Sequence, residues 1–374
     1  MIDLQAHRFV GNDARSVAAR TAFPVVEDCV YLNTASVGAV SSVYAETLAR
    51  CTDDDVSHGR ALVDHFEQVE RARSAIRDEL VIIANVEADQ LVLTQGTTSG
   101  IATVVDNLRW QPGDEVICTD LEHDACRLTI ERAARHHQLD LRVARVPRDD
   151  PTDISAFSQL ISSRTKLIAF SETTFEAGFR LPVKKIVSIA KSVGALTLID
   201  AAQAFGVVNL KLRELEVDFC AMPLQKWLCG PEGLGALYVR PGTEDYFIDL
   251  PIDRVVQGLP VLEAALAQLC WQRSELGWEW IYQQIAGLAR HANDALGLVP
   301  RSRLLTPANQ GGLTTLGFDD VDTDQMAVEL EKRKYRVRHL PEINAFRIAT
   351  ACFNTREEIN ALAGAMTEIV DGKP

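Results

Sequence analysis

The chain has 374 residues, 47% of them hydrophobic, and a formal net charge of −14 at pH 7. This length exceeds the roughly 100–200 residues of a typical domain, so we expect one large and one smaller domain. The acidic balance argues against a nucleic-acid or anionic-membrane surface, which needs clusters of Lys and Arg. No apolar run reaches the about 18 residues that span a bilayer. Residues 1–8 lack the order of a signal peptide, and the cytosol is the expected compartment.

Short β-rich runs alternate with helical stretches from about residue 26 to residue 240. Strands are predicted at 90–94, 115–119, 141–146, 166–171, 195–200 and 235–239, with a short one at 218–221. Several of these runs are apolar almost throughout, as strands buried on both faces are. Helical stretches such as 183–193 lie between them. This alternation predicts an α/β fold with a mainly parallel sheet between helices.

Pro241-Gly242 interrupts the pattern, and the chain beyond it becomes mainly helical. Helices are predicted at 262–272, 277–296, 323–334 and 357–370, the last one started by Asn354-Thr355. We predict three parts. They are an N-terminal segment 1–25 that packs on the smaller domain, a large domain 26–245, and a smaller C-terminal α+β domain 246–374.

Eight cysteines are spread along the chain, and none forms a CxxC pair. In a reducing cytosol this spacing predicts buried free thiols, because free cysteine is among the most buried residue types. Neither disulfides nor a metal site is expected.

A glycine- and threonine-rich turn, residues 95–100, follows a strand and opens a helix. Its backbone N–H groups, its hydroxyls on Thr97 and Thr98, and the helix dipole together suit a phosphate. A plain helix cap is the alternative. The turn matches neither the phosphate-binding loop of nucleotide-binding proteins nor the GxGxxG turn of dinucleotide-binding ones.

Two ionisable residues stand out further along the chain. Asp200 directly follows an apolar strand and needs a partner, because an unpaired buried carboxylate is costly; a helix cap would also explain it. Lys226 lies in an apolar setting before a glycine-rich turn, 230–235. A desolvated lysine has a lowered pKa and becomes a nucleophilic amine, whereas a surface lysine is the ordinary alternative.

Together these segments resemble the class V aminotransferase family, which includes cysteine desulfurases, isopenicillin-N epimerase-like proteins and C–S lyases. The likeness extends from Tyr31 to Ile359. Its most specific parts are Gly96–Gly100, Glu122-His123, Asp200–Gln203, and Lys226 with Gly230–Gly235. The resemblance implies an aspartate-aminotransferase-like fold and the cofactor pyridoxal 5′-phosphate (PLP). It also implies a homodimer in which a loop like 257–260 reaches into the neighbouring site.

The resemblance also assigns roles around the cofactor ring. Lys226 would carry the cofactor as an imine, and Asp200 would keep the ring nitrogen protonated, which makes the ring a better electron sink. Gln203 would donate a hydrogen bond to the ring oxygen. His123 would stack on the ring and handle protons, with a purely structural histidine as the alternative.

At the two ends of the site the resemblance implies anion binding. Thr97 and Thr98 would hold the phosphate. Arg347 matches the arginine that binds the substrate α-carboxylate, a task that suits a bidentate guanidinium. An ordinary surface ion pair is the alternative for Arg347.

The chain departs from the family at three phosphate-side positions. Pro223 replaces a small hydroxyl residue, Gln225 replaces a common histidine, and Leu259 replaces a hydroxyl in the neighbouring-subunit loop. Each change can remove one phosphate hydrogen bond of about 1.5–3 kcal/mol. We expect a rearranged cradle to which Gln225 still donates.

A fourth departure concerns sulfur chemistry. Cysteine desulfurases carry a nucleophilic cysteine ahead of the carboxylate-binding arginine, but the interval 337–346 contains none. Cys352 follows Arg347 in a strand-like run and is expected in the core. The first hypothesis is therefore a PLP lyase that acts by β-elimination on an α-amino acid or amino-acid conjugate with a leaving group such as a thioether, without an enzyme persulfide.

The alternatives on the same framework are transamination, epimerisation, or a decarboxylating or deaminating reaction. Two alternatives belong to other classes of protein. A non-catalytic binding protein is disfavoured by the intact set of Lys226, Asp200, Gln203 and His123. A nicotinamide-dependent oxidoreductase is disfavoured by the missing GxGxxG turn.

Overall fold

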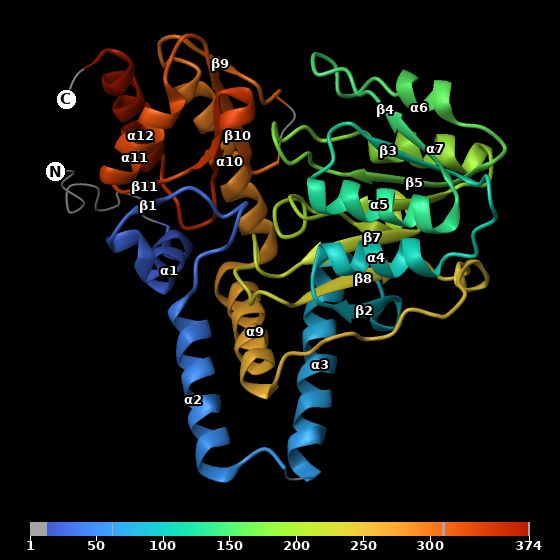
Figure 1. The fold of residues 1–374 in the computed structure, drawn as a ribbon. Coiled ribbons are helices and arrows are strands. Elements are labelled where there is room, and N and C mark those ends of the chain that lie inside the picture. Colours follow the sequence, from blue (N-terminus) through green and yellow to red (C-terminus); the bar gives the residue numbers. More distant parts are fainter. Residues whose placement is uncertain (1–12, 62, 309–310, 373–374) are drawn as a thin grey trace.

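The computed structural model describes residues 13–61, 63–308 and 311–372. Figure 1 shows a layered α/β part, a smaller part on the side where both termini lie, and a pair of helices that projects away from both. Within the described ranges, no helix is both long enough and apolar enough to cross a bilayer.

A seven-stranded sheet forms the centre of the layered part. In chain order its strands are β2 (Leu91–Thr94), β3 (Glu115–Thr119), β4 (Asp140–Ala144), β5 (Thr165–Ser171), β6 (Leu196–Asp200), β7 (Phe219–Pro223) and β8 (Gly235–Val239). Their spatial order is β2-β8-β7-β6-β5-β3-β4, and β8 runs antiparallel to both neighbours while the other pairs are parallel. The predicted α/β class with a mainly parallel sheet is confirmed. All seven predicted strands occur, although β4 ends two residues early.

Helices cover both faces of this sheet. They are α4 (Thr97–Asn107), α5 (Asp124–His137), α6 (Ser155–Leu160), α7 (Val183–Ser192) and α8 (Leu212–Leu215). Alternate residues of β5 enter different cores, Leu167 and Ala169 on the side of α4 and α5, Ile168 and Phe170 on the side of α7. Burial on both faces explains why these strands are apolar throughout in the sequence.

The smaller part holds a second sheet, which is antiparallel with the order β12-β13-β10-β9. Its elements are α10 (Trp278–Leu296), β9 (Ser302–Leu304), β10 (Leu313–Phe318), α11 (Thr323–Lys332), β12 (Arg338–Leu340), β13 (Ala345–Ala349) and α12 (Arg356–Val370). The helices were predicted, and the strands were not located in the sequence. A capping box of Thr355 and Glu358 starts α12, so the predicted start at Asn354-Thr355 is confirmed.

The N-terminal segment lies against this smaller part. Strand β1 (Val30–Tyr31), although it falls within the predicted large domain, also joins the smaller part by pairing in parallel with β11 (Tyr335–Arg336). From α1 (Ala14–Ala22), Arg20 forms a 2.7 Å ion pair with Glu358. The division into 1–25, 26–245 and 246–374 stays a proposal, and residues 1–12 fall outside the described residues.

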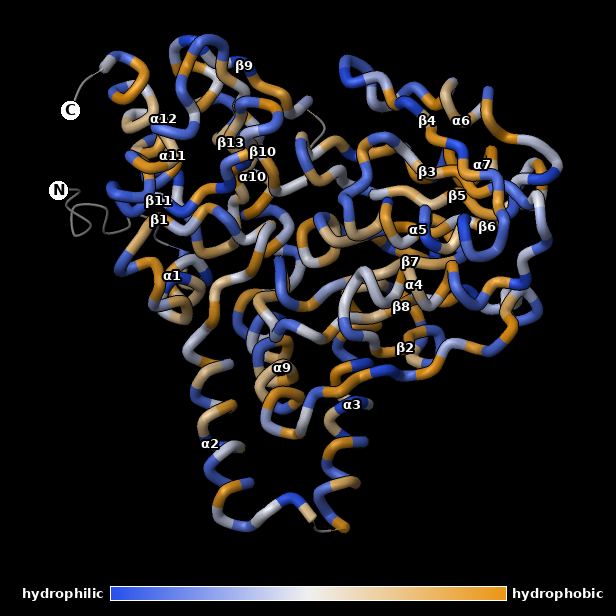
Figure 2. The backbone as a smooth tube through the Cα atoms, in the orientation of Figure 1, coloured by the Kyte–Doolittle hydropathy of each residue, from blue (hydrophilic) through white to orange (hydrophobic). Residues whose placement is uncertain are grey.

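The projecting helices are α2 (Ser42–His58) and α3 (Val63–Ala84), and α9 (Leu259–Trp271) packs against both. In Figure 2 hydrophobic and hydrophilic positions alternate along them. Near their tip Val56, Val63 and Phe66 are 81%, 76% and 67% exposed. These apolar side chains have little cover within one chain.

Candidate active site

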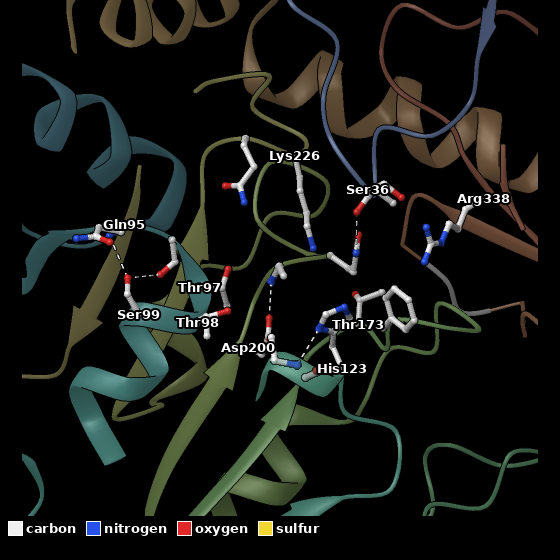
Figure 3. Close-up of a pocket in the computed structure, with 18 of the residues that line it drawn as sticks. Ser36, Gln95, Thr97, Thr98, Ser99, His123, Thr173, Asp200, Lys226 and Arg338 are labelled. Carbon is white, nitrogen blue, oxygen red and sulfur yellow. Dashed lines mark hydrogen bonds between the residues drawn. The ribbon is translucent and has the colours of Figure 1, made fainter. Parts of the chain in front are cut away.

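A cavity of about 640 Å³ opens where several strands of the large sheet end. Its lining includes all the residues to which a catalytic or binding role was assigned from the sequence, namely Thr97, Thr98, His123, Asp200, Gln203, Gln225, Lys226 and Arg347. In Figure 3, Gln95 and Ser99 lie on one side of the pocket and Arg338 on the other, with Lys226 between them. Carboxyl ends of strands are where open α/β sheets bind their ligands.

The first wall is the start of α4. Gly96 adopts φ 139°, a conformation open to glycine, and turns the chain from β2 into the helix without a side-chain cap. Ser99 Oγ donates to Gly96 O at 2.9 Å and accepts from Gln95 N at 3.0 Å, which fixes the turn. A Cβ on Gly235 would lie 2.6 Å from Gly96 Cα, so the turn also requires that glycine.

This turn fits the phosphate of a cofactor. The first N–H groups of a helix have no intrahelical partner. Thr97 Oγ1 is buried and has no hydrogen-bond partner within the described residues, and the same holds for Gln225 Oε1. An anion at the helix N-terminus would satisfy the hydroxyl and the amides together.

Asp200 lies at the carboxyl end of β6 and is buried. Burial raises the pKa of its carboxyl group, whereas hydrogen bonding by Ala202 N–H and the nearby Lys226 oppose the rise. One carboxylate oxygen accepts from Ala202 N at 2.8 Å. The residue thus caps a turn rather than the helix that the alternative interpretation expected, and it still presents a carboxylate to the cavity that a protonated ring nitrogen can pair with.

Lys226 follows β7 and points into the same cavity. The pKa of its ammonium is lowered to about 8, mainly by burial; Asp200 opposes this shift and Arg347 adds a smaller contribution to it. A substantial fraction of the side chain is therefore the neutral amine near pH 8. That is the form needed for covalent attachment of an aldehyde cofactor.

Gln203 is held firmly beside this lysine. Its Nε2 donates to Ala35 O at 3.0 Å, and its Oε1 accepts from Trp227 Nε1 at 3.1 Å. Since an amide nitrogen has two hydrogens, one remains for the role predicted from the resemblance.

His123 is the N-cap of α5, and its Nδ1 accepts from Ala125 N at 3.1 Å. This bond assigns the ring proton to Nε2 in the neutral form. Burial lowers the pKa of the imidazole, and Lys226 adds to the effect. The residue has a structural role and also lines the cavity as a neutral ring.

Glu122 anchors the loop that carries His123. Its carboxylate accepts from Ser171 Oγ at 2.6 Å and from Ser171 N at 3.1 Å, and so ties the end of β3 to the end of β5. Burial raises the pKa of Glu122 to about 7.

Arg347, on β13, is 1% exposed, which rules out a surface ion pair. Its Nη1 donates to Phe175 O at 2.9 Å and its Nη2 to Ser36 Oγ at 3.0 Å, while Nε has no partner among the described residues. Burial lowers the pKa of the guanidinium to about 10, with a further contribution from Arg338. A carboxylate would relieve this buried charge.

Sequence reasoning missed Phe175, Ser36 and Arg338, which also line the cavity. Ser36 lies close to Tyr31, where the likeness to the family begins, and this closeness was the available signal. Phe175 lies outside the motifs of the family, and Arg338 lies in the interval 337–346, which drew notice only for its lack of a cysteine.

Of the three altered positions, Gln225 lines the cavity, whereas Pro223 and Leu259 are absent from its lining. Pro223 ends β7, and Leu259 is the first residue of α9 and is buried. In the loop before it, Gln257 Nε2 donates to Glu232 O of the same chain at 2.8 Å.

All eight cysteines are free thiols, and all but Cys270 are buried. The interval before Arg347 folds into β12 and a short turn, without a cysteine. Cys352 is buried as predicted, and burial raises the pKa of its thiol to about 12. The strand-like interpretation was wrong, because Asn354 closes a turn by donating its N–H to Ala351 O at 3.0 Å. No cluster of metal-binding side chains occurs in the described part of the chain.

The model of the family described as Aminotransferase class-V matches residues 30–247. A cysteine desulfurase of Pectobacterium carotovorum subsp. carotovorum is 27% identical over 346 residues, which cover 81% of this chain and 83% of that protein. Isopenicillin N epimerase of Streptomyces clavuligerus is 27% identical over 328 residues, which cover 78% and 82%.

Two solved structures show the likeness of fold. The cystine C–S lyase C-DES, in complex with its reaction product cysteine persulfide, gives a TM-score of 0.86 at 21% identity, over 92% of this chain and 99% of that one. The cysteine desulfurase CsdA from Escherichia coli gives 0.83 at 21% identity, over 98% and 100%.

Proposed function

The chain belongs to the PLP-dependent class V aminotransferase family, and from this premise we propose that it is a lyase that cleaves a C–S bond at Cβ of an amino-acid substrate by β-elimination. The enzyme class, the cofactor and the fold follow from the family match and the structural likeness. The observation that carries the finer proposal is the cysteine-free turn before Arg347, together with the buried, high-pKa thiol of Cys352.

PLP, when bound, supplies an electron sink for negative charge at the substrate Cα. Thr97, Thr98 and Gln225 would hold its phosphate, Asp200 its ring nitrogen and Gln203 its ring oxygen. These assignments rest on the partnerless hydroxyl, the helix N-terminus and the buried carboxylate.

The residues of the chain carry out the elimination. Arg347 binds the α-carboxylate and fixes the orientation of Cα. Lys226 Nζ takes the Cα proton, the electron pair left behind forms the Cα–Cβ double bond, and the Cβ–S bond breaks with release of a thiolate. His123 lines the cavity with a neutral Nε2–H that can protonate the departing thiolate. Released aminoacrylate hydrolyses to an α-keto acid and ammonia.

The decisive experiment supplies the PLP-loaded protein with S-substituted cysteines and follows keto acid, ammonia and thiol by mass spectrometry. Stoichiometric release of all three supports the lyase. Amino-group transfer to a second keto acid, exchange of the Cα hydrogen with inversion, or release of CO₂ would instead establish transamination, epimerisation or decarboxylation. A persulfide on the protein would establish desulfurase chemistry.

We also propose a cytosolic homodimer with no nucleic-acid or membrane partner. The exposed apolar residues Val56, Val63 and Phe66 of the α2–α3 projection support a second copy as cover, and free thiols suit a reducing compartment. Light scattering on the loaded enzyme tests the dimer, and a stable, active monomer would contradict it.

A further inference from the structure

Two arginines lie directly opposite each other at the end of the cavity where the α-carboxylate of the substrate is expected to bind. Strands β12 and β13 are antiparallel, and Arg338 pairs with Arg347 in the register. Residues paired in this way point to the same face of a sheet, with their Cβ atoms about 4.5–5.5 Å apart. Both side chains line the cavity, and Figure 3 shows the Arg338 side chain at its edge, on the side of Ser36.

The two side chains differ in what they contact. Arg347 is buried, and its two terminal nitrogens already donate to Phe175 O and Ser36 Oγ. Arg338 is exposed and forms neither an ion pair nor a hydrogen bond with any residue that the structure describes. Its charge contributes to the lowered pKa of Arg347, which shows that the two guanidinium groups act on each other.

Like charges directly opposite on a sheet are destabilising, so this arrangement calls for negative charge from elsewhere. Among the described residues that line the cavity, Asp200 is the one carboxylate, and its place is beside Lys226 at the cofactor ring. The α-carboxylate of the substrate can neutralise one of the two arginines. The other remains available to a second anion.

We propose that Arg338 binds a second anionic group on the substrate, so that the enzyme acts on amino acids whose side chain or leaving group carries a carboxylate or a similar anion. This inference rests on the proposed function in one respect, the binding of the α-carboxylate by Arg347. It does not depend on which bond is then broken.

The test is a comparison of two unreactive ligands, α-methylglutamate and α-methylglutamine. They have nearly the same shape and differ in distal charge, and neither has a Cα proton to lose. Calorimetric titration of the PLP-loaded enzyme at low ionic strength should show about ten-fold tighter binding of α-methylglutamate, since a hydrogen bond to a charged group contributes that much. Arg338→Gln should abolish this preference and change α-methylglutamine binding less than about three-fold.

Arg303→Gln is the matched control. Arg303 lies on β9 of the same sheet, is 55% exposed and pairs with Asp319 away from the cavity, so its loss changes the net charge equally and should keep the preference. Equal affinities in the unaltered enzyme would overturn the inference, and so would an equal loss for both ligands in Arg338→Gln. The enzyme could prefer α-methylglutamate and yet produce no keto acid from carboxylate-bearing thioethers. That result would refute the proposed lyase activity and leave this inference intact.

Discussion

The ring of Phe175 lies 4.6 Å from the guanidinium carbon of Arg347, and the carbonyl oxygen of the same residue accepts a 2.9 Å hydrogen bond from Arg347 Nη1. The ring also makes an edge-to-face contact with His123, at 4.7 Å between centroids. One residue of the β5–α7 loop therefore holds both the carboxylate-binding cation and the histidine of the site.

This relationship predicts the effect of Phe175→Leu. Loss of the aromatic face should free the guanidinium and raise KM roughly ten-fold, because a desolvated cation–π contact contributes about 1–2 kcal/mol. The change in kcat should be smaller, since Lys226 is untouched. Steady-state kinetics measures both parameters. Phe157→Leu removes a similar buried ring from α6, outside the cavity, and should leave KM unchanged. An unaltered KM in Phe175→Leu would show that the stacking does not position Arg347.

Lys226→Ala should abolish turnover and the covalent attachment of PLP. The lysine lines the cavity and is partly buried, and no other lysine lines the cavity among the described residues. Absorbance spectra and mass spectrometry of the intact protein report attachment. Lys191→Ala, which breaks a surface ion pair with Glu216, is the control. Full activity in purified Lys226→Ala would refute the assignment.

Much of the fold was predictable because the patterns that indicate it lie within short segments of the sequence. The strands of the large sheet are continuous apolar runs, and the motifs around Lys226, Asp200 and His123 are short contiguous segments. All three side chains line one cavity. The short strands of the smaller sheet lack such runs, and they depend on pairing between segments far apart in the chain.

The missed residues have the same explanation. Arg338 becomes part of the site through its register opposite Arg347, and register is not visible in a single sequence. Phe175 is an aromatic residue in a loop, and its function depends on a guanidinium 172 residues away. Cys352 looked like part of a strand because the chain from Ile348 to Phe353 is apolar apart from Thr350, yet β13 ends at Ala349.

The lowered pKa of Lys226 predicts a pH dependence of cofactor attachment. The neutral amine is the nucleophile, and its fraction rises as pH increases through the pKa. The attachment rate of PLP to the cofactor-free enzyme should therefore rise up to pH about 8 and then level off, whereas an ordinary lysine would continue to gain toward pH 10.5. Stopped-flow absorbance measures this rate.

Two variants check the cause of that pKa. Asp200 raises the pKa of Lys226, so Asp200→Asn should move the midpoint to lower pH. Arg347 lowers it, so Arg347→Gln should move the midpoint to higher pH. A midpoint that neither variant shifts would mean that desolvation alone sets the reactivity of the lysine.

The last prediction separates elimination from persulfide chemistry. A cysteine that accepts sulfur must reach the substrate as a thiolate. Cys352 is 5% exposed, lies in a turn beyond Arg347, and has a thiol whose pKa burial raises to about 12, so at neutral pH it is protonated and enclosed. Cys352→Ser should lower stability by about 1 kcal/mol, as a hydroxyl replaces a thiol in the core, and should leave kcat within about two-fold.

Cys270 provides the control, because it is the one half-buried cysteine of the chain and a thiol reagent should modify it first. Incubation with cysteine or cystine, alkylation and peptide mass spectrometry should then find no persulfide on Cys352. Two outcomes would assign this chain to the desulfurases. One is a persulfide trapped on Cys352, and the other is a loss of turnover beyond about ten-fold in a Cys352→Ser variant with a normal melting curve. Either would mean that Cys352 becomes accessible to the substrate during turnover.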